Sequence, residues 1–191
     1  MRRKSLDLIL SVTGLVMAVV LAGAGVLFMI GGTFAHSTVT TELGSQKISF
    51  GEAATLPESL QPWAGVVVAD GPSAKAYSDL IGVHVQGIAE GKTYSEVSGE
   101  WMAATKADPV DEAAVATLGQ QRTTLFMGET LRGMLLNAYA FWTLGTIAIV
   151  AAWVSWIAAV LLLVLAFLGF AHAGSTPETE GVFEPKSMDV A

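Results

Sequence analysis

Two long stretches without charged side chains dominate the pattern of hydrophobic and polar positions. The first covers residues 8–35, and the second runs for 39 residues from Gly133 to Ala171. A helix needs roughly 20 apolar residues to cross a hydrocarbon core of about 30 Å. We therefore predict two transmembrane helices. One covers residues 8–34, and the other is contained in a long helix over residues 133–171.

The second stretch is longer than one membrane crossing requires. A helix of that length would measure about 58 Å at 1.5 Å per residue, which leaves no room for two crossings with a loop between them. We expect the helix to project beyond the outer leaflet. Asn137, Tyr139 and Trp142 would then lie near the interface, where amphipathic aromatic side chains settle.

The first stretch also resembles a signal peptide, because it follows Arg2, Arg3 and Lys4 and ends in a small-residue sequence at 33–35. Its apolar core of about 23 residues is longer than the usual 7–15 of a signal peptide. We therefore expect an uncleaved membrane anchor.

The positive charges before the first stretch predict which parts face the cytoplasm. Lys and Arg residues next to a membrane span favour the cytoplasmic side. This rule makes residues 1–7 a cytoplasmic N-terminus and residues 172–191 a cytoplasmic tail, and it places residues 35–132 outside. The tail contains two prolines and mixed charges without periodicity, so we expect it to be flexible.

Residues 35–132 show signals for both strands and helices. Alternating polar and apolar residues predict a short strand over 46–50, and the valines after Gly65 predict a second one over 65–68. Ser73 is expected to cap a helix that reaches about Glu90, with Gly91 in the left-handed conformation beyond it.

A further helix is expected to open at Asp108-Pro109, with Asp as its N-cap and Pro at its first position. No proline follows Pro109 up to the end of the second apolar stretch. This helix can therefore continue, with bends at glycines, into that stretch. The expected fold is thus a mainly α membrane protein, in which two transmembrane helices flank a small α+β extracytoplasmic domain.

Composition agrees with a membrane protein and argues against several functions. The chain is 52% hydrophobic and only 14% charged, and its net charge is −7. An acidic chain does not predict nucleic-acid binding, which requires a basic surface. The absence of cysteine excludes disulfides, thiolate metal sites and cysteine nucleophiles.

Catalytic chemistry is not indicated by any motif. The chain lacks a nucleophile elbow, a phosphate-binding loop and a zinc-protease signature. The expected topology places His36 and His172 on opposite sides of the membrane, and His84 has no partner at a metal-ligand spacing. We therefore expect a protein that is not an enzyme and that has no catalytic, cofactor-binding or metal-binding residues.

Small residues at regular spacing predict helix-packing surfaces instead. Their spacing forms a heptad seam in the second stretch and a four-residue repeat in the first, which lets another helix approach closely. The two seams can pair with each other or with a partner protein. The predicted interface consists of Gly14, Ala18, Ala22, Gly145, Ala148, Ala152, Ser155 and Ala159.

A set of short motifs between residues 42 and 132 carries a resemblance to a known family. The motifs are Glu42-Leu43, Lys47-Ile48, Gly71-Pro72, Ala76-Tyr77, Asp79, His84, Gly91-Lys92-Thr93-Tyr94, Arg122-Thr123 and Leu131-Arg132. With these motifs the chain resembles a family of small two-span membrane proteins of actinobacteria, whose members are often labelled "aromatic ring-opening dioxygenase". Such an enzyme needs a non-haem iron held by two histidines and a carboxylate, which the expected topology does not bring together. The label is therefore not expected to describe this chain.

Small two-span proteins of this kind also look like the accessory subunits of the cytochrome bcc–aa3 respiratory supercomplex. That resemblance implies a non-catalytic accessory or assembly subunit, whose partners are lipid and a larger integral-membrane complex. The alternative is a stand-alone envelope protein that binds or senses a ligand. Its pocket would be built from Trp63, Tyr77, Trp101 and the valines at 66–68.

Overall fold

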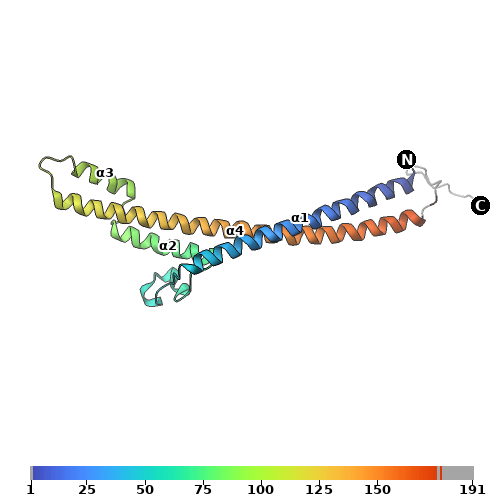
Figure 1. Cartoon of the computed structure of the whole chain (residues 1–191), viewed down its shortest axis with the longest axis horizontal. Helices are drawn as coiled ribbons and strands as arrows, with labels where there is room; N and C mark the ends of the chain where they lie inside the picture. Colours follow the sequence, from blue (N-terminus) through green and yellow to red (C-terminus); the bar gives the residue numbers. More distant parts are fainter. Residues whose placement is uncertain (1, 176, 178–191) are drawn as a thin grey trace, which may run out of the picture. The chain divides into compact units, whose positions relative to one another are not determined.

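The computed structural model describes residues 2–175 and 177, and almost all of its regular structure is helical (Figure 1). The chain divides into two compact units. The described parts of 1–33 and 146–191 form one, here called the helix-pair unit, and residues 34–145 form the other, here called the central unit. The elements are α1 (Arg3–Ser45), η1 (Ala53–Thr55), η2 (Glu58–Trp63), α2 (Gly71–Ile88), α3 (Tyr94–Ala104) and α4 (Glu112–Ser175).

Two of these helices are long and apolar enough to cross a membrane. α1 has 43 residues and α4 has 64, and their most apolar windows have mean hydropathies of 2.4 and 2.7. Only 11% of each window is buried inside the protein. Such helices are typical of a membrane protein, because a soluble protein would bury an apolar run of this length.

The prediction of an α+β domain is wrong. Among the described residues the two expected strands form only one antiparallel bridge, between Ser49 and Val67. Their backbones exchange few hydrogen bonds, such as Phe50 N–H to the Val66 oxygen at 3.0 Å. An isolated two-stranded ribbon is marginal in stability. The pairing also stops at Gly65, which has a φ of +69° and follows the 3-10 helix η2.

The expected helix over 73–90 is present as α2, but Ser73 is not its N-cap. Asp70 caps the helix and accepts a hydrogen bond from the Ser73 backbone N–H at 2.8 Å, while the Ser73 hydroxyl completes a capping box. Gly91 adopts the left-handed conformation as expected, with a φ of +82°. The capping residue therefore lies three positions earlier than predicted.

The helix expected from Asp108-Pro109 begins later, as α4 at Glu112, and continues to Ser175. The Asp111 carboxylate caps it by accepting a hydrogen bond from the Ala114 N–H at 3.0 Å. α3 was not anticipated, although Thr93 and Glu96 form a capping box at its start. The tail expected over 172–191 falls mostly outside the described residues.

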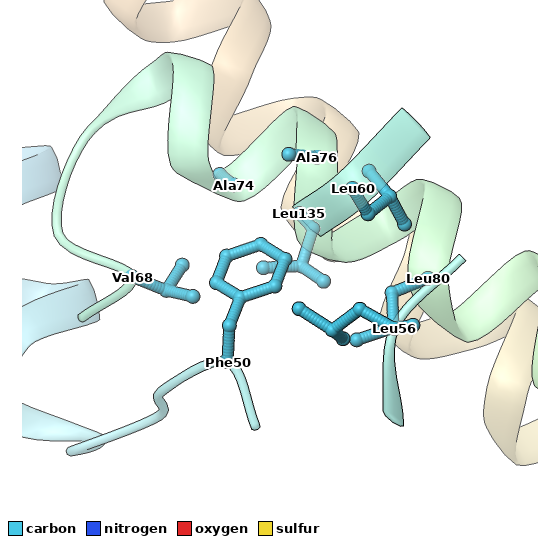
Figure 2. Packing of buried hydrophobic residues seen from close by; sticks show 8 residues of the cluster. All are labelled: Phe50, Leu56, Leu60, Val68, Ala74, Ala76, Leu80 and Leu135. Atoms are coloured by element: carbon cyan, nitrogen blue, oxygen red, sulfur yellow. The ribbon is translucent and has the colours of Figure 1, made fainter. Parts of the chain in front are cut away.

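Apolar side chains from irregular segments and helices form the core of the central unit (Figure 2). Phe50 stacks near Trp63 with ring centroids 5.8 Å apart and meets the edge of Tyr77 at 5.1 Å. Instead of forming a sheet, the segments around 50 and 68 thus direct apolar side chains onto α2 and α4. The buried cluster consists of Phe50, Leu56, Leu60, Val68, Ala74, Ala76, Leu80 and Leu135.

α2 packs closely against α4 within the central unit because small residues lie at the contacts. A side-chain carbon added to Gly71 would lie 2.5 Å from the Trp142 ring, and one added to Gly128 would lie 2.2 Å from Val85. The residue numbers rise on α2 as they fall on α4, so the two helices are antiparallel.

Candidate functional site

Buried small residues follow a seven-residue repeat on both helices of the helix-pair unit. Ala18 of α1 is 1% exposed and Ala152 of α4 is fully buried. A heptad repeat keeps one face of a helix directed at its neighbour, and small side chains allow the backbones to approach. The repeating buried positions are Ser11, Ala18, Gly25 and Gly32 on α1, and Ala152, Ala159, Ala166 and Ala173 on α4.

The eight residues predicted from the sequence occupy different environments. Ala18, Ala152 and Ala159 are buried in the helix-pair unit, and Gly145 is buried in the central unit. The remaining four are half-buried: Gly14, Ala22, Ala148 and Ser155. A carbon added to Gly14 would lie 3.7 Å from the Ala166 Cβ, so at this position the α1 seam meets α4 at a residue outside the predicted set.

Trp156 makes a polar contact between α1 and α4 in the helix-pair unit. Its indole Nε1–H donates a hydrogen bond to the backbone oxygen of Ala22 at 3.3 Å. A side-chain carbon on Gly25 would lie only 2.4 Å from that nitrogen. The close approach of the indole therefore requires glycine at position 25.

A second close contact lies near the other end of the same helix pair. The Ser11 hydroxyl donates to the backbone oxygen of Asp7 at 2.7 Å, and a carbon added to Gly169 would lie 2.1 Å from the Ser11 Oγ. His172 Nε2 lies 3.8 Å from the Asp7 carboxylate. The ends of α1 and α4 are thus joined by polar groups as well as by small side chains.

Trp142, expected at the membrane interface, is packed inside the central unit. Its indole is stacked on the His36 ring, with centroids 3.8 Å apart and planes 5° from parallel. His36 Nε2 also lies 3.1 Å from the Trp142 backbone oxygen. Because Gly71 contacts the same indole, one side chain joins α1, α2 and α4.

A largely apolar cavity of about 610 Å³ lies within the central unit, between α1, α2 and α4. This volume falls in the range of small-molecule sites, which are mostly apolar with a few polar groups. Its polar groups are the Glu42 carboxylate, the Gln46 amide and the Tyr77 hydroxyl. The cavity is lined by Glu42, Leu43, Gln46, Ile48, Tyr77, Ile81, Leu131, Met134 and Leu135.

Of the pocket residues suggested by the sequence, Trp63, Tyr77 and Val68 pack around Phe50 in the core, but the suggested residues do not line one cavity. Tyr77 lines the cavity just described, whereas Trp63 lines a separate one of about 490 Å³. The Trp101 ring lies under the Arg122 guanidinium, 4.4 Å away. Val68 is buried in the core, and the valines at 66–67 are exposed. Only Tyr77 therefore belongs to the larger cavity.

The three histidines lie in different surroundings. His36 contacts Trp142, His172 lies near Asp7, and His84 is exposed on α2. Among residues 2–175, no group of three or more His, Asp or Glu side chains has a geometry that could hold a metal ion.

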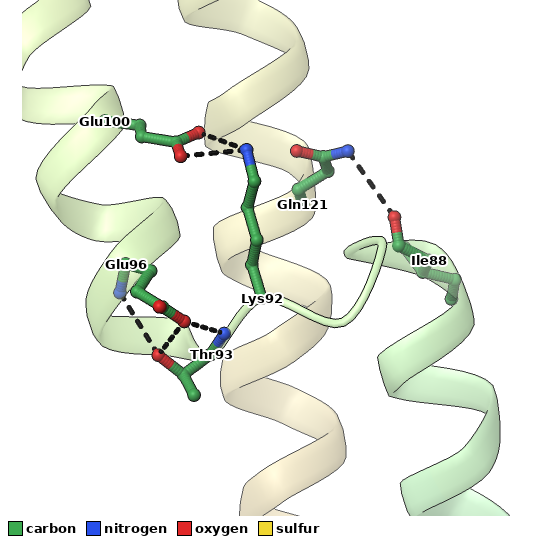
Figure 3. Close-up of polar contacts among 6 residues, drawn as sticks. All are labelled: Ile88, Lys92, Thr93, Glu96, Glu100 and Gln121. Carbon is green, nitrogen blue, oxygen red and sulfur yellow. Dashed lines mark hydrogen bonds and ion pairs between the residues drawn. The ribbon is translucent and has the colours of Figure 1, made fainter.

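At the turn into α3, two groups have pKa values that depart from the ordinary ones: the Glu96 carboxyl and the Lys92 ammonium (Figure 3). Hydrogen bonds from the Thr93 backbone N–H and hydroxyl to Glu96 lower the pKa of that carboxyl. A hydrogen bond to the Glu100 carboxylate, at 2.8 Å, raises the pKa of Lys92. Both side chains are solvent-exposed, so these interactions order the turn rather than create a reactive site.

Sequence reasoning missed the cavity because its walls come from three distant segments. The sequence shows the apolar residues Leu43, Ile48, Leu131, Met134 and Leu135, but their convergence depends on the packing of α2. No known protein family, curated protein or solved structure matches the chain.

Proposed function

We propose that the protein is a non-catalytic accessory or assembly subunit of a larger membrane complex. The observation that carries this proposal is the length of its exposed apolar surface. Residues 8–41 of α1 and 133–171 of α4 contain no Asp, Glu, Lys or Arg. At 1.5 Å per residue these segments measure about 51 and 58 Å, well beyond a hydrocarbon core of about 30 Å.

Large apolar side chains remain exposed on the α4 portion of the central unit. Phe126 is 59% exposed and Met127 is 52% exposed. Both residues precede the charge-free segment at 133–171. A single bilayer that covered the whole of that segment would leave both side chains outside. Neighbouring exposed apolar side chains such as these two are typical of surfaces that contact another protein. Within the charge-free segment of the same unit, Leu136, Tyr139 and Phe141 are exposed as well.

The partner we propose is the actinobacterial cytochrome bcc–aa3 respiratory supercomplex. Support comes from the resemblance of the sequence to accessory subunits of that assembly. In this proposal α1 and α4 pack at the rim of the larger subunits, through the large apolar side chains that face away from their small-residue seam. The central unit docks on the extracytoplasmic surface, because Arg2, Arg3 and Lys4 favour cytoplasmic termini.

Affinity purification of the full-length protein in mild detergent tests the partner. We expect subunits of the respiratory supercomplex in stoichiometric amounts. Replacing Phe126 and Met127 together with Gln should reduce that recovery, whereas replacing Lys106 with Gln, an exposed change elsewhere in the central unit, should not. Recovery of the protein alone would contradict the proposal.

Cysteine labelling tests the proposed orientation. The chain contains no cysteine, so a single introduced thiol gives a background-free signal. A membrane-impermeant maleimide should label Ser95→Cys in the central unit on intact cells and should label Ser5→Cys only after lysis. The opposite pattern would reverse the topology.

A further inference from the structure

We propose that Asp7 and His172 form a proton-dependent latch between the start of α1 and the end of α4, which tightens when the His172 imidazole is protonated. The two ends lie side by side in the helix-pair unit (Figure 1). The latch uses only residues of this unit, so it does not depend on the central unit or on the proposed partner complex. With the orientation proposed above, it responds to the pH of the cytoplasm.

Ionisable side chains are rare in the helix-pair unit, and two of them meet at this end. Among its described residues, which are 2–33, 146–175 and 177, Asp7 is the only acid and His172 is the only histidine. The remaining ionisable side chains there are Arg2, Arg3 and Lys4. The fold thus places one carboxylate and one imidazole on facing helices, with His172 Nε2 3.8 Å from Asp7 Oδ2.

The Asp7 oxygen that faces His172 lacks a hydrogen-bond partner. Asp7 Oδ2 is buried and accepts no hydrogen bond. A buried acceptor without a donor keeps the full cost of losing its water. A charge-assisted N–H···O bond has a length of about 2.7–2.9 Å. The imidazole therefore needs to move only about 1 Å closer to supply the missing donor.

Close packing of the two helices keeps this pair within reach. Gly169 lies one turn before His172 on α4, and a side-chain carbon added there would collide with the Ser11 hydroxyl. That hydroxyl donates to the Asp7 backbone oxygen at 2.7 Å, which leaves the Asp7 carboxylate for another donor. The His172 side chain is 55% exposed, so its ring can turn toward Asp7 and exchange protons with water.

Protonation changes what His172 offers to the carboxylate. A neutral imidazole with its proton on Nδ1 presents a lone pair at Nε2, whereas an imidazolium donates from both nitrogens. A charge-assisted hydrogen bond is roughly twice as strong as a neutral one. Histidine ordinarily changes its charge between about pH 5 and 8, so the latch tightens as the pH falls through this range and loosens as it rises.

The other charged groups at this end do not supply the response. Arg3 and Lys4 lie one turn before Asp7 on α1, and both are engaged in interactions. Arginine and lysine side chains keep their charge over the range in which histidine titrates. On the α4 side, residues 146–175 contain no ionisable side chain except that of His172.

Pulsed EPR distance measurements on the full-length protein in lipid nanodiscs test the latch. The chain has no cysteine, so Ser5→Cys and Ala171→Cys carry the two nitroxides at exposed positions near the pair. We expect one short distance at about pH 5.5 and an added population of longer distances at about pH 8. Because His172 is half-exposed, the ratio of the short to the long population should fall only about two- to fivefold.

Three variants identify the groups responsible. His172→Gln and Asp7→Asn should each make this ratio independent of pH over the same range. His172→Lys keeps a positive charge at both pH values and should hold the short distance at both. His84→Gln is the matched control, because it removes an exposed histidine of the central unit and should leave the pH response unchanged.

Three results would overturn the proposal. Identical distance distributions at both pH values, without the substitutions at 7 and 172, would show that the helix ends do not respond to protons. A pH response that persists in His172→Gln or in Asp7→Asn would assign the response to another group. Opening of His172→Lys at about pH 8 would show that positive charge at position 172 does not close the pair. These measurements use the purified protein, so the latch and the partner complex can fail separately.

Discussion

In the helix-pair unit the most deeply buried side chains belong to Ala18 and Ala152, whereas in the central unit Phe50, Leu60 and Leu135 fill the interior. The exposed side chains of the two units also differ in kind. Large apolar side chains cover the outside of the helix pair, and the outside of the central unit also carries ion pairs such as Lys75 with Asp79.

This difference indicates whether water or lipid is the solvent to which each unit is suited. In water, burying large apolar side chains supplies the driving force for folding. Between helices in lipid that force is absent, and association depends on close packing of small residues and on interhelical hydrogen bonds. The Trp156 contact with the Ala22 oxygen at 3.3 Å is an interaction of the second kind. Four substitutions, three of them with a control variant, and one pH titration can break or sharpen this comparison.

Phe50→Ala should have the largest effect, and it should be confined to the central unit. Phe50 is 3% exposed and contacts Trp63 and Tyr77. Truncating a buried phenylalanine costs about 3–5 kcal/mol. Proteolysis of residues 46–70 should accelerate while α1 and α4 of the helix-pair unit remain protected. Val67→Ala, at a position that is 52% exposed, should change the free energy of unfolding by less than about 0.5 kcal/mol.

Gly25→Ala should destabilise the helix-pair unit by about 1–3 kcal/mol, because the added carbon overpacks the contact with Trp156. Titration with denaturing detergent measures this loss. Gly23→Ala is the matched control, because a carbon added there meets nothing within 4 Å. Equal stability of the two variants would show that the unit does not depend on close approach at position 25.

Asp70→Ala should destabilise α2 by about 1 kcal/mol, because it removes the cap from the Ser73 N–H. Hydrogen exchange at the first turn of α2 measures the effect. Asp79→Ala breaks only the exposed pair with Lys75 and should cost about 0.3–0.5 kcal/mol. A larger loss in Asp70→Ala than in Asp79→Ala would show that the stability of the central unit depends more on the helix cap than on the surface ion pair.

The smallest expected effect is a pH dependence at the turn into α3. Because Thr93 lowers the pKa of Glu96, ionised Glu96 stabilises the folded turn above the ordinary carboxyl pKa. This contribution is lost as the pH falls through the lowered folded value. A carboxyl NMR titration should give a midpoint below the ordinary value.

Thr93→Val separates the two donors at that turn. It removes the hydroxyl and keeps the backbone N–H, which is the larger cause of the shift. The midpoint should therefore move only part of the way back. Full restoration of the ordinary value would show that the hydroxyl is responsible for the whole shift.

The sequence by itself determined the two apolar helices and the positions of their small residues. Their signal is local, because charge-free length and heptad spacing can be read along one segment at 1.5 Å per residue. It also indicated α2 and the left-handed Gly91, since glycine is the residue that most readily adopts that backbone conformation.

Tertiary packing alone decided the rest. The segments around 50 and 67 carry strand-like patterns, but a single bridge is all they form, because their apolar side chains are buried by α2 and α4 instead of by a sheet. The stacking of His36 on Trp142 and the walls of the cavity join residues about a hundred positions apart. Such contacts depend on the mutual placement of helices, which local propensity does not encode.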